Sequence, residues 1–200
     1  AVIKGKKVYD PRDSSAAPAW SDNPALCIRD YLTSTGYGLG EAAANINDTA
    51  FSAAATVCDE TNTTDSTTRY TANGAFTTGA TPQDLLNNLI TSMGANLWYT
   101  QGAWNVKAAK WYNPVIHLDE DDLRSGLSLA TRHSRRDNFN TVNGTFRGEE
   151  SNWQVTDFPP VSNSDFVTAD GGLASALDLE LPFTDNSIEA RRIARIMLER

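Results

Sequence analysis

The chain has 200 residues, of which 40% are hydrophobic and 21% are charged, so it can bury a sizeable core and is not generally disordered. It contains 17 Lys and Arg residues and 25 Asp and Glu residues. The resulting formal net charge of −8 argues against duplex nucleic acid as the main partner. No apolar run approaches the roughly 20 residues that cross a bilayer, and no secretory signal opens the chain. Two cysteines are too few for a disulfide framework or a metal finger.

The two ends of the sequence are unusual. The chain lacks an initiator Met, begins inside a predicted strand, and stops inside a predicted helix that has no C-cap glycine. These features predict an internal segment of a longer polypeptide.

Helix signals are clear in the first half of the chain. Asn23 is a predicted N-cap with Pro24 at the first helical position, and Asn47 or Asp48 is predicted to cap a second helix. Thr81 is predicted to cap a third helix, which ends at Gly94. The apolar stripe of this third helix, expected to pack against the hairpin that carries Trp98 and Trp104, is Leu85, Leu86, Leu89, Ile90 and Met93.

Strand signals are scattered along the whole chain. Gln101-Gly102 is predicted to be the two-residue turn of a hairpin between residues 96–100 and 103–107. Further strands are predicted at residues 1–9, 69–72, 115–118, 127–131, 139–146 and 176–181. Residues 148–172 are predicted to be mostly loop. An Asn186/Glu189 capping box opens a last helix with Ile193, Ala194 and Met197 on its apolar stripe. This order predicts an α+β fold in which the second half is mostly antiparallel β.

No catalytic or metal-binding motif is convincing. His117 and His133 lie in predicted strands and are interpreted as structural histidines. Residues 126–130 only faintly resemble a nucleophile elbow, because the final glycine is missing. Residues 119–122 form an acidic run without the spacing of a calcium loop, and we interpret it as a solvated turn.

Other polar and aromatic features also have structural explanations. The glycine-rich residues 36–40 follow a helix rather than a strand, which disfavours a dinucleotide site. Cys27 and Cys58 lie on apolar helix faces and are predicted to be buried, reduced thiols. Two groups of side chains remain as candidate contact residues, the basic Arg132, Arg135 and Arg136 and the aromatic Trp98, Trp104 and Trp111. We therefore predict no catalytic residue, cofactor or metal, and a scaffold rather than an enzyme.

A series of short blocks in this sequence resembles one known family. The blocks are VYDPR at 8–12, WSDNPAL at 20–26, DYL at 30–32, YGLG at 37–40, AATVCDE at 54–60, RY at 69–70, NG at 73–74, LDEDDL at 118–123, RRD at 135–137, FN at 139–140, GTF at 144–146, DFPPV at 157–161, DLELPF at 178–183 and ARRIARIMLER at 190–200. In this order they resemble the tail tip attachment proteins of lambda-like siphophages and prophages, also called host specificity protein J or central tail hub. The resemblance extends over nearly the whole chain.

The resemblance implies a domain organisation. Residues 1–12 would be the exit strand of a preceding hub barrel, residues 13–113 an inserted α/β hub domain, and residues 114–200 a barrel-like β hub domain with a terminal packing helix. It also implies that Asn143-Gly144, which local rules would make a hairpin turn, lies within a strand.

The resemblance further implies a structural role in the virion. The expected function is a hub segment that helps to form a trimeric ring between the tail tube and the receptor-binding tip, assembled in the cytoplasm of the bacterial host. The expected partners are other copies of the chain and neighbouring tail tube or distal tail proteins, with host receptors bound by regions outside this segment. The alternatives are a receptor- or carbohydrate-binding module that uses exposed tryptophans, and a tail-associated hydrolase that uses a carboxylate pair.

Overall fold

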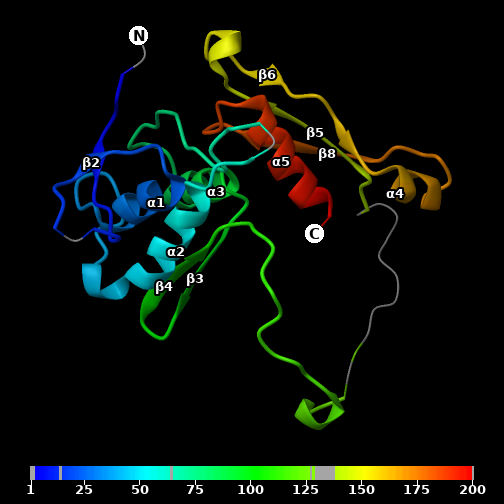
Figure 1. The fold of residues 1–200 in the computed structure, drawn as a ribbon, viewed down its shortest axis with the longest axis horizontal. Coiled ribbons are helices and arrows are strands. Elements are labelled where there is room, and N and C mark those ends of the chain that lie inside the picture. Colours follow the sequence, from blue (N-terminus) through cyan, green and yellow to red (C-terminus); the bar gives the residue numbers. More distant parts are fainter. Residues whose placement is uncertain (1–2, 14, 64, 127, 129–137, 200) are drawn as a thin grey trace.

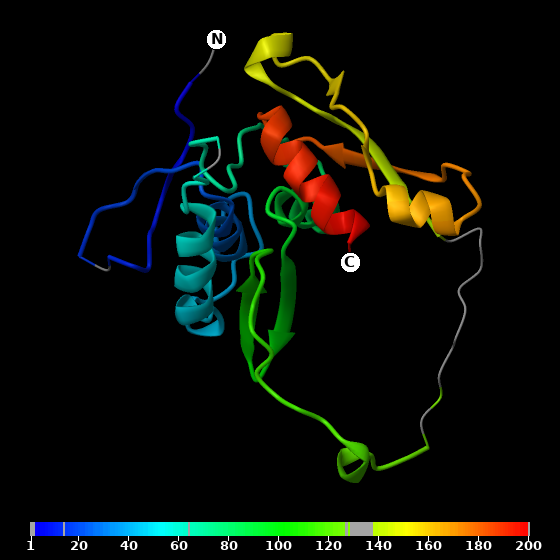
Figure 2. The same cartoon turned by 45° about the vertical axis from the view of Figure 1, so that its right-hand side comes forward.

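The computed structural model describes residues 3–13, 15–63, 65–126, 128 and 138–199. A helical group with one hairpin lies beside a group formed by an open sheet and its helices (Figures 1 and 2). The chain is thus α+β, as predicted, and most of its strand pairs are antiparallel. No helix in the described part of the chain is long and apolar enough to span a membrane.

Side-chain caps define the first two helices. Asn23 caps α1 (Pro24–Thr33), since its side-chain oxygen accepts from the amide groups of Ala25 and Leu26. Asn47 caps α2 (Asp48–Cys58) in the same way. The Asn23 amide group also donates to the carbonyl oxygen of Ala55 at 2.9 Å, which ties the start of α1 to α2. Both predicted caps are therefore confirmed.

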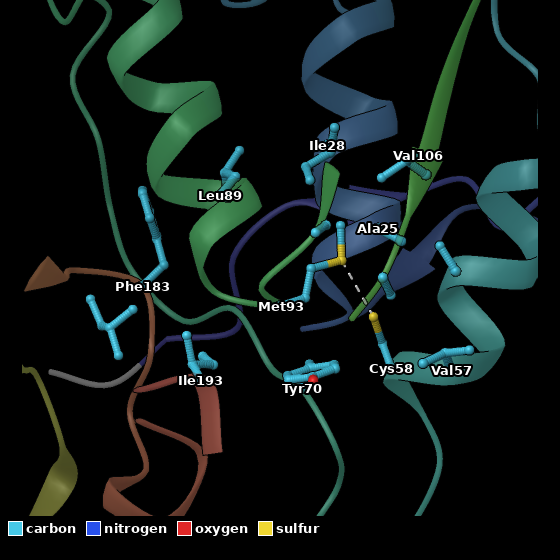
Figure 3. Close-up of a cluster of buried hydrophobic side chains, with 14 of the residues drawn as sticks. Ala25, Ile28, Val57, Cys58, Tyr70, Leu89, Met93, Val106, Phe183 and Ile193 are labelled. Carbon is cyan, nitrogen blue, oxygen red and sulfur yellow. Dashed lines mark hydrogen bonds between the residues drawn. The ribbon is translucent and has the colours of Figure 1, made fainter. Parts of the chain in front are cut away.

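Helix α3 (Pro82–Thr91) forms where predicted, but its packing is only in part the expected one. Leu85, Leu89 and Met93 are buried, and Leu86 and Ile90 are half-buried. The helix packs mainly against α1. Leu89 and Met93 also share one core with Val106 of the hairpin, so the expected packing against this hairpin is seen in part (Figure 3). The second strand of the hairpin packs mainly against α2.

The hairpin is confirmed residue for residue. Strand β3 (Asn96–Thr100) pairs antiparallel with β4 (Ala103–Lys107). Gln101 and Gly102 have φ values of 52° and 80°, the left-handed pair that a tight two-residue turn requires.

Two predicted strands of the N-terminal half are wrong or too long. Strand β1 spans only Lys7–Val8 and pairs antiparallel with β2 (Ala19–Trp20). Residues 69–72 form no strand, because Tyr70 is fully buried in the core and its neighbours bond to other parts of the chain instead of a ladder.

The second sheet is centred on β5 (Thr141–Phe146). On one side β5 pairs antiparallel with β6 (Thr156–Asp157) and β7 (Val161–Ser162), and on the other it pairs in parallel with β8 (Ala176–Leu181). The loop predicted at 148–172 is thus wrong, because it contains β6, β7 and helix α4 (Ser164–Ala169). The described strands form an open sheet and not a closed barrel.

Gly144 lies in the middle of β5, with Asn143, and not in a turn. A Cβ atom at Gly144 would lie 2.0 Å from the carbonyl oxygen of Leu179 and 2.8 Å from the ring of Phe158. The glycine is therefore needed for the close approach of β8 to β5.

Helix α5 (Ser187–Leu198) lies across the sheet, against β5 and β7 (Figure 1). Ile193 and Ala194 are buried, as predicted. Met197 is exposed, and Leu198 is buried instead, because it lies one turn beyond Ala194 on the same face. Ile193 and Phe183 then meet Tyr70 and Met93 in one core that joins both groups of elements (Figure 3).

We predict that Leu89→Ala lowers the free energy of unfolding by about 2–5 kcal/mol, because it leaves a cavity in this core. Asn87→Ala on the exposed face of α3 is the matched control and should change stability by less than about 0.5 kcal/mol. Denaturant unfolding of both variants measures this. A loss below about 1 kcal/mol for Leu89→Ala would contradict the packing.

Candidate functional site

A buried carboxyl group connects the two groups of elements. Glu189, in the first turn of α5, is only 2% exposed. One of its carboxyl oxygens accepts a hydrogen bond from the amide group of Thr71 at 2.9 Å, and the other accepts from the Thr71 hydroxyl at 2.9 Å. The side chain therefore does not complete the predicted capping box with Asn186, because it reaches across to the loop at residues 69–73.

Neighbouring polar groups extend this contact. Asp185 accepts from the Asn73 amide group at 2.8 Å, and the Asn73 backbone amide donates to the carbonyl oxygen of Phe183 at 2.7 Å. Arg192 donates to the carbonyl oxygen of Arg69 at 2.6 Å. We call Thr71, Asn73, Asp185, Glu189 and Arg192 the polar junction.

The electrostatics of the polar junction favour a neutral acid. Burial raises the pKa of Glu189 to about 8, and the nearby Asp185 charge contributes to the rise. Burial also raises the pKa of Asp185. Paired carboxyl groups with raised pKa values are typical of acid–base catalysts as well as of structural clusters.

The surroundings of the pair indicate a structural role. Thr71 and Asn73 already bond to these carboxyl groups. A hollow of about 270 Å³ is lined by residues that include Tyr31, Tyr37 and Phe76, and neither carboxyl group lines it. A second hollow, beside Phe146 and Leu181, does not include the pair either.

The sequence candidates for catalysis are not brought together. His117 lies exposed in an extended segment without a strand, so its predicted strand is wrong, and an exposed side chain there gives no support to its interpretation as a structural histidine. His133 lies outside the described residues, as do Arg132, Arg135 and Arg136 and most of residues 126–130. The structure thus provides no partner for a histidine base among the residues that it describes.

The acidic run is a turn, as predicted. Residues Glu120–Asp122 form a short 3-10 helix. Asp119 accepts from the amide of Asp121 at 3.0 Å, and Asp122 accepts from the amide of Asp119 at 3.1 Å. The carboxylates thus satisfy the backbone of their own turn. No group of three metal-ligating side chains gathers within the described residues.

The glycine-rich loop and the cysteines are also explained by packing. The amide of Leu39 bonds to the carbonyl oxygen of Tyr31, so this loop caps the end of α1. Cys58 is buried with its sulfur 3.5 Å from that of Met93 (Figure 3). Cys27 is only half-buried, less than predicted. Both cysteines are free thiols.

The tryptophans differ in exposure. Trp98 and Trp111 are exposed, whereas Trp104 is half-buried and packs edge-on against Tyr99. None of the three lines the hollow beside Tyr31 or the second hollow beside Phe146 and Leu181.

The most unusual surface is a stretch of apolar side chains after the hairpin. Trp111, Val115, Ile116 and Leu118 are 81%, 96%, 70% and 67% exposed. We call residues 111–118 the apolar segment. The sequence predicted a strand at 115–118, and the structure shows extended chain without a ladder, so this prediction is wrong for the isolated chain. Contiguous exposed apolar side chains are typical of a surface that is covered by a partner.

Comparison with known proteins gives no relative from which a function could be inferred. No protein-family model matches the chain, and no curated protein matches it significantly.

We predict that both cysteines stay reduced and unreactive in the native protein. Burial raises the pKa of each thiol to about 12, so little thiolate is available for alkylation at pH 8. Mass spectrometry without reductant should show two free thiols that become labelled only on unfolding. A Cys27–Cys58 disulfide would contradict this.

We predict that Glu189→Gln removes a pH dependence of stability. The folded state keeps the Glu189 proton up to about pH 8 and the unfolded state releases it near pH 4.5, so the free energy of unfolding falls as pH rises between these values. Glutamine cannot ionise, so the variant should not lose this stability. Its free energy of unfolding, relative to that of the wild type, should rise by about 2–5 kcal/mol between pH 5 and pH 9.

Glu199→Gln, at the exposed end of the same helix, is the matched control and should keep the wild-type slope. Denaturant unfolding across this pH range measures all three proteins. Parallel slopes for wild type and Glu189→Gln would show that Glu189 is not buried as a neutral acid.

Proposed function

We propose that this chain is a structural segment of the hub at the tail tip of a lambda-like phage or prophage. Copies of it would help to close a trimeric ring between the tail tube and the receptor-binding tip, in a virion assembled in the bacterial cytoplasm. Residues 1–12 would be the exit strand of a preceding barrel, residues 13–113 the inserted domain, and residues 114–200 the barrel-like domain.

The observation that carries the proposal is the apolar segment. The free energy of leaving Trp111, Val115, Ile116 and Leu118 in water is unfavourable, since a fully exposed large apolar side chain forgoes about 1.5–3 kcal/mol of burial. A chain that serves as part of a larger assembly recovers this free energy on assembly. An independent globular enzyme has no such use for the segment.

Two further observations support the proposal. The sheet centred on β5 is open in the described residues, as expected of strands that a larger barrel would complete. Gly144 lies in the middle of β5. The resemblance predicts this position, whereas the local turn rule predicts a hairpin turn there.

The alternatives have less support. A hydrolase needs a reachable carboxylate pair, and the pair at Asp185 and Glu189 is enclosed by hydrogen bonds to Thr71 and Asn73. A carbohydrate-binding module needs a groove, and neither the hollow beside Tyr31 nor the one beside Phe146 and Leu181 includes Trp98, Trp104 or Trp111.

Sedimentation tests the proposal. We expect the 200-residue chain to be monomeric or weakly associated and the complete hub protein that contains it to be a trimer, because exposed polar pairs alone contribute only about 0–1 kcal/mol each. Gold-labelled antibodies against the chain should bind at the tail tip in electron micrographs. A complete protein that stays monomeric at micromolar concentration would remove the ring, and labelling elsewhere would remove the location.

A further inference from the structure

We infer that residues 113–118 become a β-strand by adding to the free edge of β8 in a second copy of this chain. The inference rests on the proposed ring, for which it names the contact between subunits.

The donor is strand-like but unpaired. Residues 113–118 contain β-branched Val115 and Ile116, and their backbone makes no hydrogen bond to another described residue. Both side chains are exposed, so the segment can pair without first leaving a packed site. An extended segment of this kind binds by adding to a sheet edge, where main-chain hydrogen bonds supply the affinity.

The acceptor is an edge of matching length. Strand β8 has six residues and pairs only with β5 among the described strands, so its other edge is open. Leu179 and Leu181 are buried on one face of β8, and Asp178 and Glu180 are exposed on the other. A strand added to this edge would extend both the apolar face and the acidic face of the sheet.

The side chains of the two strands are complementary. Alternation places Ile116 and Leu118 on one face of an added strand and Val115 and His117 on the other. If the apolar face continues that of Leu179, His117 lies on the same side as Asp178. The sequence has cations but no acid between residues 103 and 118, and acids but no cation between 170 and 190. This favours the contact and opposes pairing of β8 with itself.

A second copy is the occupant that the arrangement favours. In both views the apolar segment leads away from the sheet rather than along β8 (Figures 1 and 2). A donor and an acceptor at different places on one chain make a head-to-tail contact, which repeats from copy to copy and closes if the rotation allows. This is the geometry that a ring needs.

Disulfide trapping between differently tagged copies tests the contact. One copy carries His117→Cys and the other carries Asp178→Cys or Glu180→Cys, and the mixture is oxidised at high concentration. The native Cys27 and Cys58 are held as unreactive thiols by burial. We expect a disulfide between the two tags, which also distinguishes contact between copies from contact within one. Ala53→Cys, exposed on α2, is the matched control acceptor and should give no product.

Pro114 has no N–H, so an added strand must turn residue 114 away from β8, and the Val115 N–H then points toward β8. Val115→Pro in the donor removes this backbone donor and should abolish the cross-link. Because Val115 is exposed and lies outside helices and strands, this variant should unfold at the same denaturant concentration as the wild type. Loss of the cross-link with unchanged stability would support strand addition.

The outcomes separate the two proposals. Association of the complete protein into a trimer without a cross-link from residue 117 overturns strand addition and leaves the ring. A specific cross-link in a protein that forms no trimer supports strand addition and removes the ring. Equal cross-linking to Ala53→Cys, or no cross-link at any concentration tested, overturns strand addition.

Discussion

The joining of the two halves of this protein depends on the burial of one acid. Glu189 enters the core at the start of α5, and its carboxyl group must be neutral or fully hydrogen-bonded there, because an unpaired buried charge costs several kcal/mol. Thr71 supplies both hydrogen bonds from a loop 118 residues away in sequence. The loop is therefore held in a non-strand conformation, which directs Tyr70 inward and places Asn73 against Asp185.

Apolar packing follows from this anchoring. Tyr70 is fully buried, and its hydroxyl donates to the carbonyl oxygen of Ala109 at 2.8 Å, so the residues after the hairpin are held as well. Ile193 of α5 enters the same core as Met93, beside the end of α3 (Figure 3). The buried cluster is thus continuous across the helical group and the sheet group. The chain behind the apolar segment is consequently fixed at Ala109, while the segment itself extends from a rigid base.

Sequence reasoning succeeds here for several local interactions, although Thr81 starts α3 without the predicted side-chain cap. The caps Asn23 and Asn47 and the Gln101-Gly102 turn act within a few residues, and the structure has them as predicted. It fails where distant chain segments decide. Glu189 prefers Thr71 to its local cap, β8 pairs in parallel with β5, and residues 148–172 gain short strands only because β5 provides an edge. The polar junction has no local signal at all.

The distribution of satisfied and unsatisfied groups indicates where this molecule acts. Glu189, two carboxylates of the acidic turn and the glycine-rich loop bond to their own chain. The unmet requirements are of another kind, the backbone of residues 113–118 and the outer edge of β8. Each needs hydrogen bonds of the type that the other can supply. Free main-chain groups and exposed apolar side chains of this kind are satisfied by contact with another polypeptide.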